Sequence, residues 1–244
     1  MKNQETQTKK EALKTQLHTV DLCVIGGGIG GMFTAISAAR NGAKVALMHD
    51  RPVLGGNASS EIRMWISGAG TRVRDLQETG ILEELLLENM YRNPTRNYST
   101  WDALLYEMVR FEPNIDLMLN CTCLSAETDG NRIVSVTGFQ LTTYLRHEVH
   151  AKLFADCSGD SVLAPLTGAD FRVGREARSE FGEDIAPVVS DNRTMGMSCL
   201  FTRAAVRKKV PSPPTLRAIS KSNSSPVNSP FTSGSIPKAS VRNE

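Results

Sequence analysis

Apolar residues gather into two short runs near the N-terminus, separated by glycines and a segment of small residues. Residues 20–25 form the first run, which is almost continuously apolar and ends at Gly26. Such a run is typical of a strand buried on both faces of a parallel sheet. The Ala-rich segment 32–40 predicts a helix that stops before Gly42, and residues 44–48 predict a second buried strand. The pattern indicates a βαβ unit with two parallel strands.

The middle of the chain departs from a simple alternation of strands and helices. Apolar residues at helical spacing predict two helices, and a third buried strand follows them. Beyond it, β-branched residues alternate with polar ones between turn signals, which predicts an antiparallel meander and then a return to the main sheet. We therefore expect helices at 81–91 and 100–111, a strand at 115–119, meander strands at 121–128, 132–141 and 143–150, a return strand at 152–156, and a short helix at 160–166.

Composition divides the chain into three parts. Residues 1–19 are rich in Lys, Gln and Thr and lack an apolar leader segment, so we expect a polar N-terminal extension. Residues 20–206 carry the periodic apolar pattern of a globular domain. Residues 207–244 are rich in Ser and Pro and contain few large apolar side chains, so we expect a disordered tail.

Charge and cysteine spacing exclude several classes of function. The formal net charge is +2, but seven of the 28 basic residues and one of the 26 acidic residues lie in 207–244, which leaves −4 for the rest of the chain. A nucleic-acid partner is therefore not indicated. No two of the five cysteines form a C-x-x-C pair, so we expect neither a metal site nor a disulfide framework. No apolar run is long enough to span a bilayer, and we expect a cytoplasmic protein without a membrane partner.

The motif that carries chemistry is Gly26-x-Gly28-x-x-Gly31, which lies between the first predicted strand and its helix. Gly26 permits a tight turn, Gly28 lets the backbone approach a pyrophosphate, and Gly31 lets the helix pack closely on the strand. The start of the helix also offers free N–H groups and a partial positive charge. A dinucleotide is the expected ligand. A glycine-rich turn without a ligand is the alternative, which the surrounding strand-helix-strand pattern disfavours.

The second predicted strand ends at His49-Asp50, where a dinucleotide site needs a hydrogen-bond acceptor for the adenosine ribose. Asp50 lies 19 residues after Gly31. A carboxylate at this place repels a 2′-phosphate, which argues against NADP. His49 could accept the same hydroxyl through a neutral ring nitrogen, so the sequence leaves both residues as candidates.

Three segments in this order, 24–31, 50–57 and 156–160, resemble the FAD-dependent oxidoreductases of the glutathione-reductase-like flavoprotein superfamily. More narrowly, they are similar to the branch that includes the flavin subunit of heterodisulfide reductase. The resemblance covers about residues 20–206. It implies an α/β fold, a Rossmann-like FAD-binding domain with a parallel sheet, a helical insertion and an antiparallel β-meander crossover. It also implies FAD as the cofactor.

The resemblance places each contact with FAD on a residue of this sequence. Four glycines of the first loop would cradle the pyrophosphate, and the family's ribose-binding Glu aligns with His49, so either His49 or Asp50 must replace it. A second glycine loop would approach the ribityl chain. In the third segment Gly159 would allow close approach, and Asp160 would accept a hydroxyl or, alternatively, cap a helix. The predicted cofactor-binding residues are Gly26, Gly28, Gly30, Gly31, His49, Asp50, Gly55, Gly56, Asn57, Gly159 and Asp160.

The resemblance implies an FAD-dependent oxidoreductase, or its cofactor-binding part, that transfers a hydride between an unknown small-molecule substrate and the flavin. No catalytic residue is assigned, because the flavin ring itself takes the hydride. Flavoproteins of this architecture continue well past 244 residues, so we expect the domain at 20–206 to be incomplete and the sequence after about Val206 to be out of frame. A designed linker or a disordered interaction tail is the alternative for this last segment. A truncated, non-catalytic dinucleotide-binding fragment and an NAD-binding enzyme are the alternatives.

Overall fold

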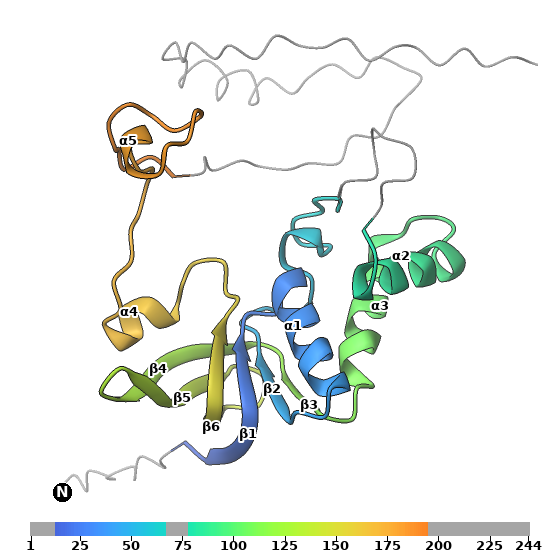
Figure 1. Cartoon of the computed structure of the whole chain (residues 1–244). Helices are drawn as coiled ribbons and strands as arrows, with labels where there is room; N and C mark the ends of the chain where they lie inside the picture. The colour runs from blue at the N-terminus through green and yellow to red at the C-terminus, as the bar shows by residue number, and fades with distance from the viewer. Residues whose placement is uncertain (1–12, 67–77, 195–244) are drawn as a thin grey trace, which may run out of the picture. The chain divides into compact units, whose positions relative to one another are not determined.

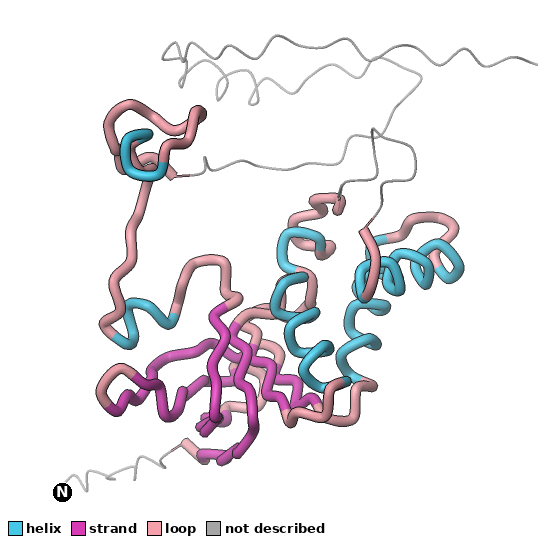
Figure 2. Tube along the Cα trace, viewed as in Figure 1, coloured by secondary structure: helices cyan, strands magenta, loops and turns pink. Residues whose placement is uncertain are grey.

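The computed structural model describes residues 13–66 and 78–194. Within them, one six-stranded sheet has the order β3-β2-β1-β6-β5-β4 (Figures 1 and 2). The elements are β1 Thr15–Ile25, α1 Ile29–Arg40, β2 Val45–Met48, the 3₁₀ turn η1 Gly56–Ala58, α2 Ile81–Arg92, α3 Tyr98–Arg110, β3 Ile115–Met118, β4 Cys121–Asp129, β5 Arg132–Gln140, β6 Leu145–Asp156, α4 Leu163–Thr167 and α5 Arg178–Phe181.

The parallel half of the sheet confirms the predicted βαβ unit. β1 lies between β2 and β6 and pairs with both in parallel, and β2 pairs in parallel with β3. Side chains alternate between two apolar clusters: Val24 and Leu47 belong to one, whereas Cys23 and Ala46 belong to the other. Successive strand residues point to opposite faces, so both faces of the parallel strands are buried.

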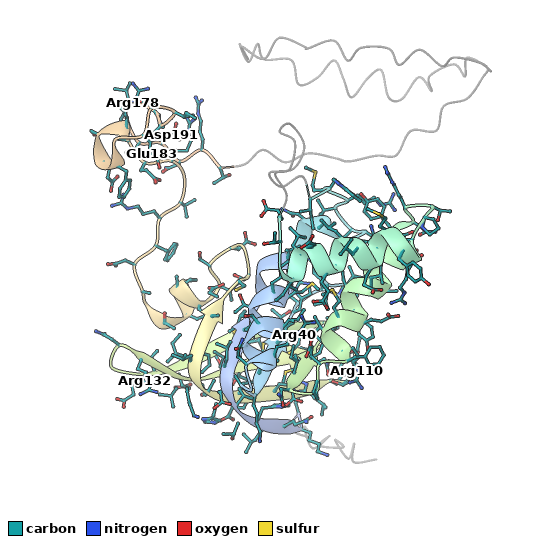
Figure 3. The ribbon with its side chains drawn as sticks, turned by 45° about the vertical axis from the view of Figure 1, so that its right-hand side comes forward. Arg40, Arg110, Arg132, Arg178, Glu183 and Asp191 are labelled. Atoms are coloured by element: carbon teal, nitrogen blue, oxygen red, sulfur yellow. The ribbon has the colours of Figure 1, made fainter. Side chains whose placement is uncertain are left out.

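Helices cover the first of these faces. Met32 and Ile36 of α1 pack with Leu105 of α3 and Leu85 of α2 in one buried cluster. Arg40 lies at the end of α1 (Figure 3). Its Nη1 and Nη2 atoms donate to Glu84 of α2, and its Nε donates to Glu112 after α3 at 2.6 Å. The apolar cluster supplies most of the stability here, because ion pairs as exposed as these contribute about 0–1 kcal/mol each.

The meander covers the second face, although it belongs to the same sheet. β2 and β5 are separated in the strand order by β1 and β6. A Cβ added at Gly138 of β5 would nevertheless lie 2.6 Å from Sδ of Met48 on β2. The sheet must therefore bend back over itself, and Gly138 provides the space for the contact. The long strands β4 and β5 run across β1 and β6 in Figure 1.

The largest differences from the sequence prediction concern β6 and β1. The segments 143–150 and 152–156, predicted as separate elements, form the single strand β6. Its first half pairs antiparallel with β5, and its whole length pairs in parallel with β1. β1 itself begins at Thr15, within the predicted polar extension, because its first residues pair with β6 between Arg146 and His150.

The C-terminal part of the chain is described up to residue 194. α4 begins at Leu163, three residues later than the sequence predicts. The predicted tail at 207–244 and Cys199 lie outside the described residues. Among the helices of the described ranges, none has the length and apolar character needed to cross a bilayer.

Candidate functional site

The first glycine loop connects the end of β1 to the start of α1, and packing requires glycine at two of the four predicted positions. A Cβ at Gly26, whose φ is +103°, would lie 2.3 Å from the carbonyl oxygen of Cys157. A Cβ at Gly31 would lie 1.8 Å from the carbonyl oxygen of Gly26. These two residues hold the turn against the loop that follows β6 and against the first turn of α1, as the sequence predicts.

The other two predicted glycines, Gly28 and Gly30, face open space instead. An added Cβ at either position would meet no atom within 4 Å. Gly28 is the N-cap of α1, no side chain caps the helix, and its first turn contains no acidic residue. The first N–H groups of a helix have no partner within it, and the helix dipole favours an anion there. Open space above uncapped amides fits a diphosphate group.

A second glycine loop lies directly beside the first. The Gly55 amide donates to the Gly27 carbonyl at 2.8 Å, and Gly28 and Gly55 form a parallel bridge. A Cβ at Gly56, whose φ is +55°, would approach the Cα of Gly28 to 3.1 Å. Asn57 is exposed next to this contact. The structure thus brings together the two glycine segments that the sequence separates by more than 20 residues.

His49 is buried under the first glycine loop, with 5% of its surface exposed. Its Nδ1 accepts a hydrogen bond from the Gly27 amide at 2.9 Å, and its Nε2 lies 3.0 Å from the Val53 carbonyl oxygen. A carbonyl oxygen can only accept, so Nε2 carries the proton and the ring is neutral. Burial lowers the pKa of His49, in agreement with a neutral ring.

This geometry separates the two candidates for the ribose contact. Both nitrogens of His49 are already bonded to the backbone, so neither is left for a ribose hydroxyl. Asp50 instead keeps 60% of its side chain exposed. Asp50 is therefore the residue of the pair that can accept a hydrogen bond from a ligand.

A cavity of about 80 Å³ lies next to Asp50 and the first glycine loop. Its polar lining includes Asp50, Ser158 and Asp160, and its apolar lining comes mainly from Ile25, Met48 and Val162. Cysteines 121 and 123 of β4 also border it. Burial raises the pKa of Cys121 to about 12 and that of Cys123 to about 11, so both thiols are protonated at neutral pH.

The loop after β6 is held by Asp156, a role that the sequence analysis did not assign. Its Oδ1 accepts hydrogen bonds from the amide and hydroxyl of Ser158 at 3.0 and 2.6 Å. Its Oδ2 accepts from the Leu163 amide at 2.7 Å. Asp156 therefore binds the first amide of α4 although it is not the N-cap residue, which is Val162, whereas Asp160 stays exposed at the cavity beside Gly159, whose φ is +83°.

Within the described ranges, no three His, Cys, Asp or Glu side chains converge where they could hold a metal ion.

Gly27 was also missed by the sequence analysis. A Cβ there would lie 2.7 Å from Cγ of His49 and 2.6 Å from Cδ2 of Leu54, so it must be glycine for packing. The run of three glycines was the available signal.

The chain is similar to a known protein family and to individual known proteins. The family described as FAD dependent oxidoreductase matches residues 21–232, beyond the predicted end of the domain at 206. Over 51 residues the chain is 49% identical to a fumarate reductase (cytochrome) of Shewanella frigidimarina, a stretch of 20% of this chain and 9% of that protein.

Solved structures of low identity were also found. A geranylgeranyl bacteriochlorophyll reductase-like protein of Thermoplasma acidophilum has a TM-score of 0.44 at 17% identity over 64% of this chain and 43% of its own. The FrdA chain of E. coli quinol fumarate reductase has a TM-score of 0.41 at 14% identity over 59% of this chain and 33% of its own. The chain spans less than half the length of each of these relatives. Because the family match covers most of its residues, the chain belongs to the FAD dependent oxidoreductases, and FAD is its cofactor.

Proposed function

We propose that this chain is an oxidoreductase, or the cofactor-binding part of one, that moves a hydride between a small-molecule substrate and FAD. The observation that carries the proposal is the open space above Gly28 and Gly30 at the uncapped start of α1. A glycine-rich turn without a ligand needs glycine only where packing or backbone conformation demands it. Gly28, with φ −65° and ψ 175°, meets neither demand.

The proposal assigns residues of this chain to each part of FAD. The pyrophosphate would lie on Gly26, Gly28, Gly30 and Gly31, and the ribose would bond Asp50. The adenosine end would extend toward the cavity beside Asp50, where Asp160 offers a second acceptor. The segment Gly55-Gly56-Asn57 belongs to the loop after β2 and lies against Gly28. This segment would hold the other end of the pyrophosphate and the ribityl chain.

When bound, FAD supplies the ring that accepts or returns the hydride. The residues of this chain bind and orient it: amides of the α1 start neutralise the diphosphate, and carboxylates select sugar hydroxyls. A carboxylate at Asp50 also disfavours a 2′-phosphate, which supports FAD over NADP. No residue of the described ranges is assigned a part in the proton or hydride transfer itself.

The proposal also concerns partners and location. The partner is an unidentified small-molecule substrate, with neither nucleic acid nor a membrane involved, and the protein is cytoplasmic. The four cysteines of the described ranges are free, which suits a reducing compartment. Membership of the narrower branch that includes the heterodisulfide reductase flavin subunit stays a prediction.

The test is to express the full chain and record its visible spectrum. The proposal expects oxidised-flavin bands that a chemical reductant bleaches, and release of FAD on denaturation. A folded, colourless protein that takes up no added FAD would support the non-catalytic fragment. Release of NAD would support the nicotinamide alternative. A protein that binds FAD but cannot be reduced would refute the redox role while leaving the cofactor site intact.

A further inference from the structure

We propose that His49 is a positioning residue that locks the first glycine loop in its binding conformation, and that protonation of its ring releases FAD at acidic pH. The inference rests on the proposed function, because it assumes that FAD is the ligand of the loop. It assigns His49 a different task from the ribose contact, which falls to Asp50.

The contacts of His49 tie together the two loops that would hold the pyrophosphate. Its Nδ1 accepts from the amide of Gly27, which directly precedes the N-cap of α1. Its Nε2–H donates to Val53, two residues before Gly55. A single buried ring therefore fixes the position of one glycine loop relative to the other.

The His49 ring packs directly against Gly27, so that only glycine fits at this position of the first loop. The space a Cβ would need at Gly27 is taken by the His49 ring and Leu54, at 2.7 and 2.6 Å. A backbone hydrogen bond also joins the two glycine loops without the ring, since the Gly55 amide donates to the Gly27 carbonyl at 2.8 Å. Rotation of the ring away from Gly27 would leave that amide unpaired under the loop, which is costly for a buried group.

Protonation would break this arrangement at one atom. In the charged ring Nδ1 carries a hydrogen, which would point at the hydrogen of the Gly27 amide, so two donors would face each other. The Val53 contact would survive, because Nε2 is a donor in both forms. The ring or the loop must then move, and the movement displaces the residues next to Gly28.

The charges around the ring act in both directions. Asp50, whose Oδ1 lies 3.4 Å from Nδ1, and Glu61 favour the charged ring, whereas Arg51 disfavours it. Arg51 is itself paired with Glu61 at 3.0 Å. Cys121, whose amide donates to the His49 carbonyl, carries a protonated thiol. Burial is the largest influence and lowers the pKa of His49, so the ring is neutral at physiological pH.

If His49 acted only as a charge near the bound diphosphate, FAD binding would depend on pH in the opposite direction. A protonated ring close to an anion would then strengthen binding as the pH falls. The lock predicts the reverse, that the dissociation constant of FAD increases as the pH falls. The sign of the pH dependence therefore distinguishes a positioning residue from an electrostatic one.

The experiment measures FAD binding by the full chain from about pH 8 to about pH 4, a range that extends below the ordinary titration of histidine because burial lowers the pKa of His49. We expect a flat profile at high pH and, below the titration of His49, an increase in the dissociation constant that approaches tenfold per pH unit, the limit for one proton. His49→Asn keeps an acceptor near the Nδ1 position and cannot titrate, so its profile should be flat.

His147→Asn is the matched control, because His147 is buried to the same 5% and contacts His18 and Gln140 rather than a glycine loop. It should keep the wild-type profile. A wild-type profile in His49→Asn, or tighter binding at acidic pH in the wild-type chain, would overturn the inference. If FAD binds at no pH, the proposed function fails rather than the lock.

A nitrogen NMR titration of the FAD-free chain tests the lock without cofactor or variant. We expect a neutral, Nε2-protonated ring at neutral pH and a change in the Gly27 amide resonance that follows the titration of His49. A ring protonated at Nδ1, or a Gly27 amide that does not respond, would overturn the inference even if FAD binds.

Discussion

Replacement of Gly28 by Ala separates the role of this residue in binding from any role in folding. In the structure an added Cβ would meet no atom within 4 Å, and φ and ψ of −65° and 175° suit any residue. We therefore expect the free energy of unfolding to change by less than about 0.5 kcal/mol, as for an ordinary surface substitution. The methyl group would instead occupy space assigned to the diphosphate.

The expected loss of affinity follows from the amides at the start of α1. If the methyl group displaces the diphosphate from one of them, one hydrogen bond to a charged group is lost, a cost of about 1.5–3 kcal/mol. The dissociation constant of FAD should therefore increase roughly 10- to 150-fold. Ser37→Ala, on the exposed side of α1, is the control and should alter neither quantity.

Flavin fluorescence on titration of the full chain gives the affinity, and thermal unfolding of the FAD-free chain gives the stability. Unchanged FAD affinity in Gly28→Ala would refute the placement of the pyrophosphate. A large loss of stability without FAD would show that Gly28 is needed for packing, and the argument from open space would fail.

Four further predictions follow from the same contacts. Gly31→Ala should destabilise the FAD-free chain by more than about 2 kcal/mol, because its Cβ would lie 1.8 Å from the Gly26 carbonyl; an unaltered melting temperature would contradict this. Asp50→Ala should weaken FAD binding about 10- to 150-fold without loss of stability, whereas equal binding would return the ribose contact to another residue. Asp156→Ala should cost about 1 kcal/mol of stability, measured by denaturant unfolding, through loss of its hydrogen bonds to Ser158 and Leu163, and no change would refute its role in holding the loop after β6. Burial lowers the pKa of His49 in the folded state, so the stability that the neutral ring contributes is complete above about pH 6.5 and is lost as the pH falls through the folded pKa. Over this pH range the free energy of unfolding of His49→Asn should therefore fall less than that of the wild-type chain.

The βαβ unit could be predicted because its signals are local. The apolar run before Gly26, the small-residue helix and the second run each lie within a few residues of the chain. The start of β1 could not be found in this way. Residues Thr15 to Thr19 are largely polar, and they form a strand because β6 pairs with them from more than 120 positions away.

The single strand β6 shows the same limit. The strand pairs in parallel with β1 over its length, whereas only its first half also pairs with the meander strand β5, and no turn residue marks the end of that second pairing near Ala151. An alternating pattern predicts a strand but not which strands will pair with it. The bend that brings Gly138 against Met48 depends on the whole sheet.

The site was predictable at the level of segments, and less so at the level of side chains. The family resemblance identified both glycine loops as segments that contact FAD, and the structure shows that they lie side by side. The task of His49 depends on a hydrogen bond to Gly27 across 22 residues, which no local pattern encodes. Similarly, the sequence offered Asp160 as a cap, but only the course of the loop shows that Asp156 reaches the amide of Leu163.

The most direct test of the central claim is a crystal structure of the full chain with FAD. We predict that the diphosphate oxygens accept hydrogen bonds from backbone amides at the start of α1, with Gly28 and Gly55 on either side and the adenosine ribose on Asp50. A diphosphate bound elsewhere on the chain, or a ribose bonded to the ring of His49, would contradict the account.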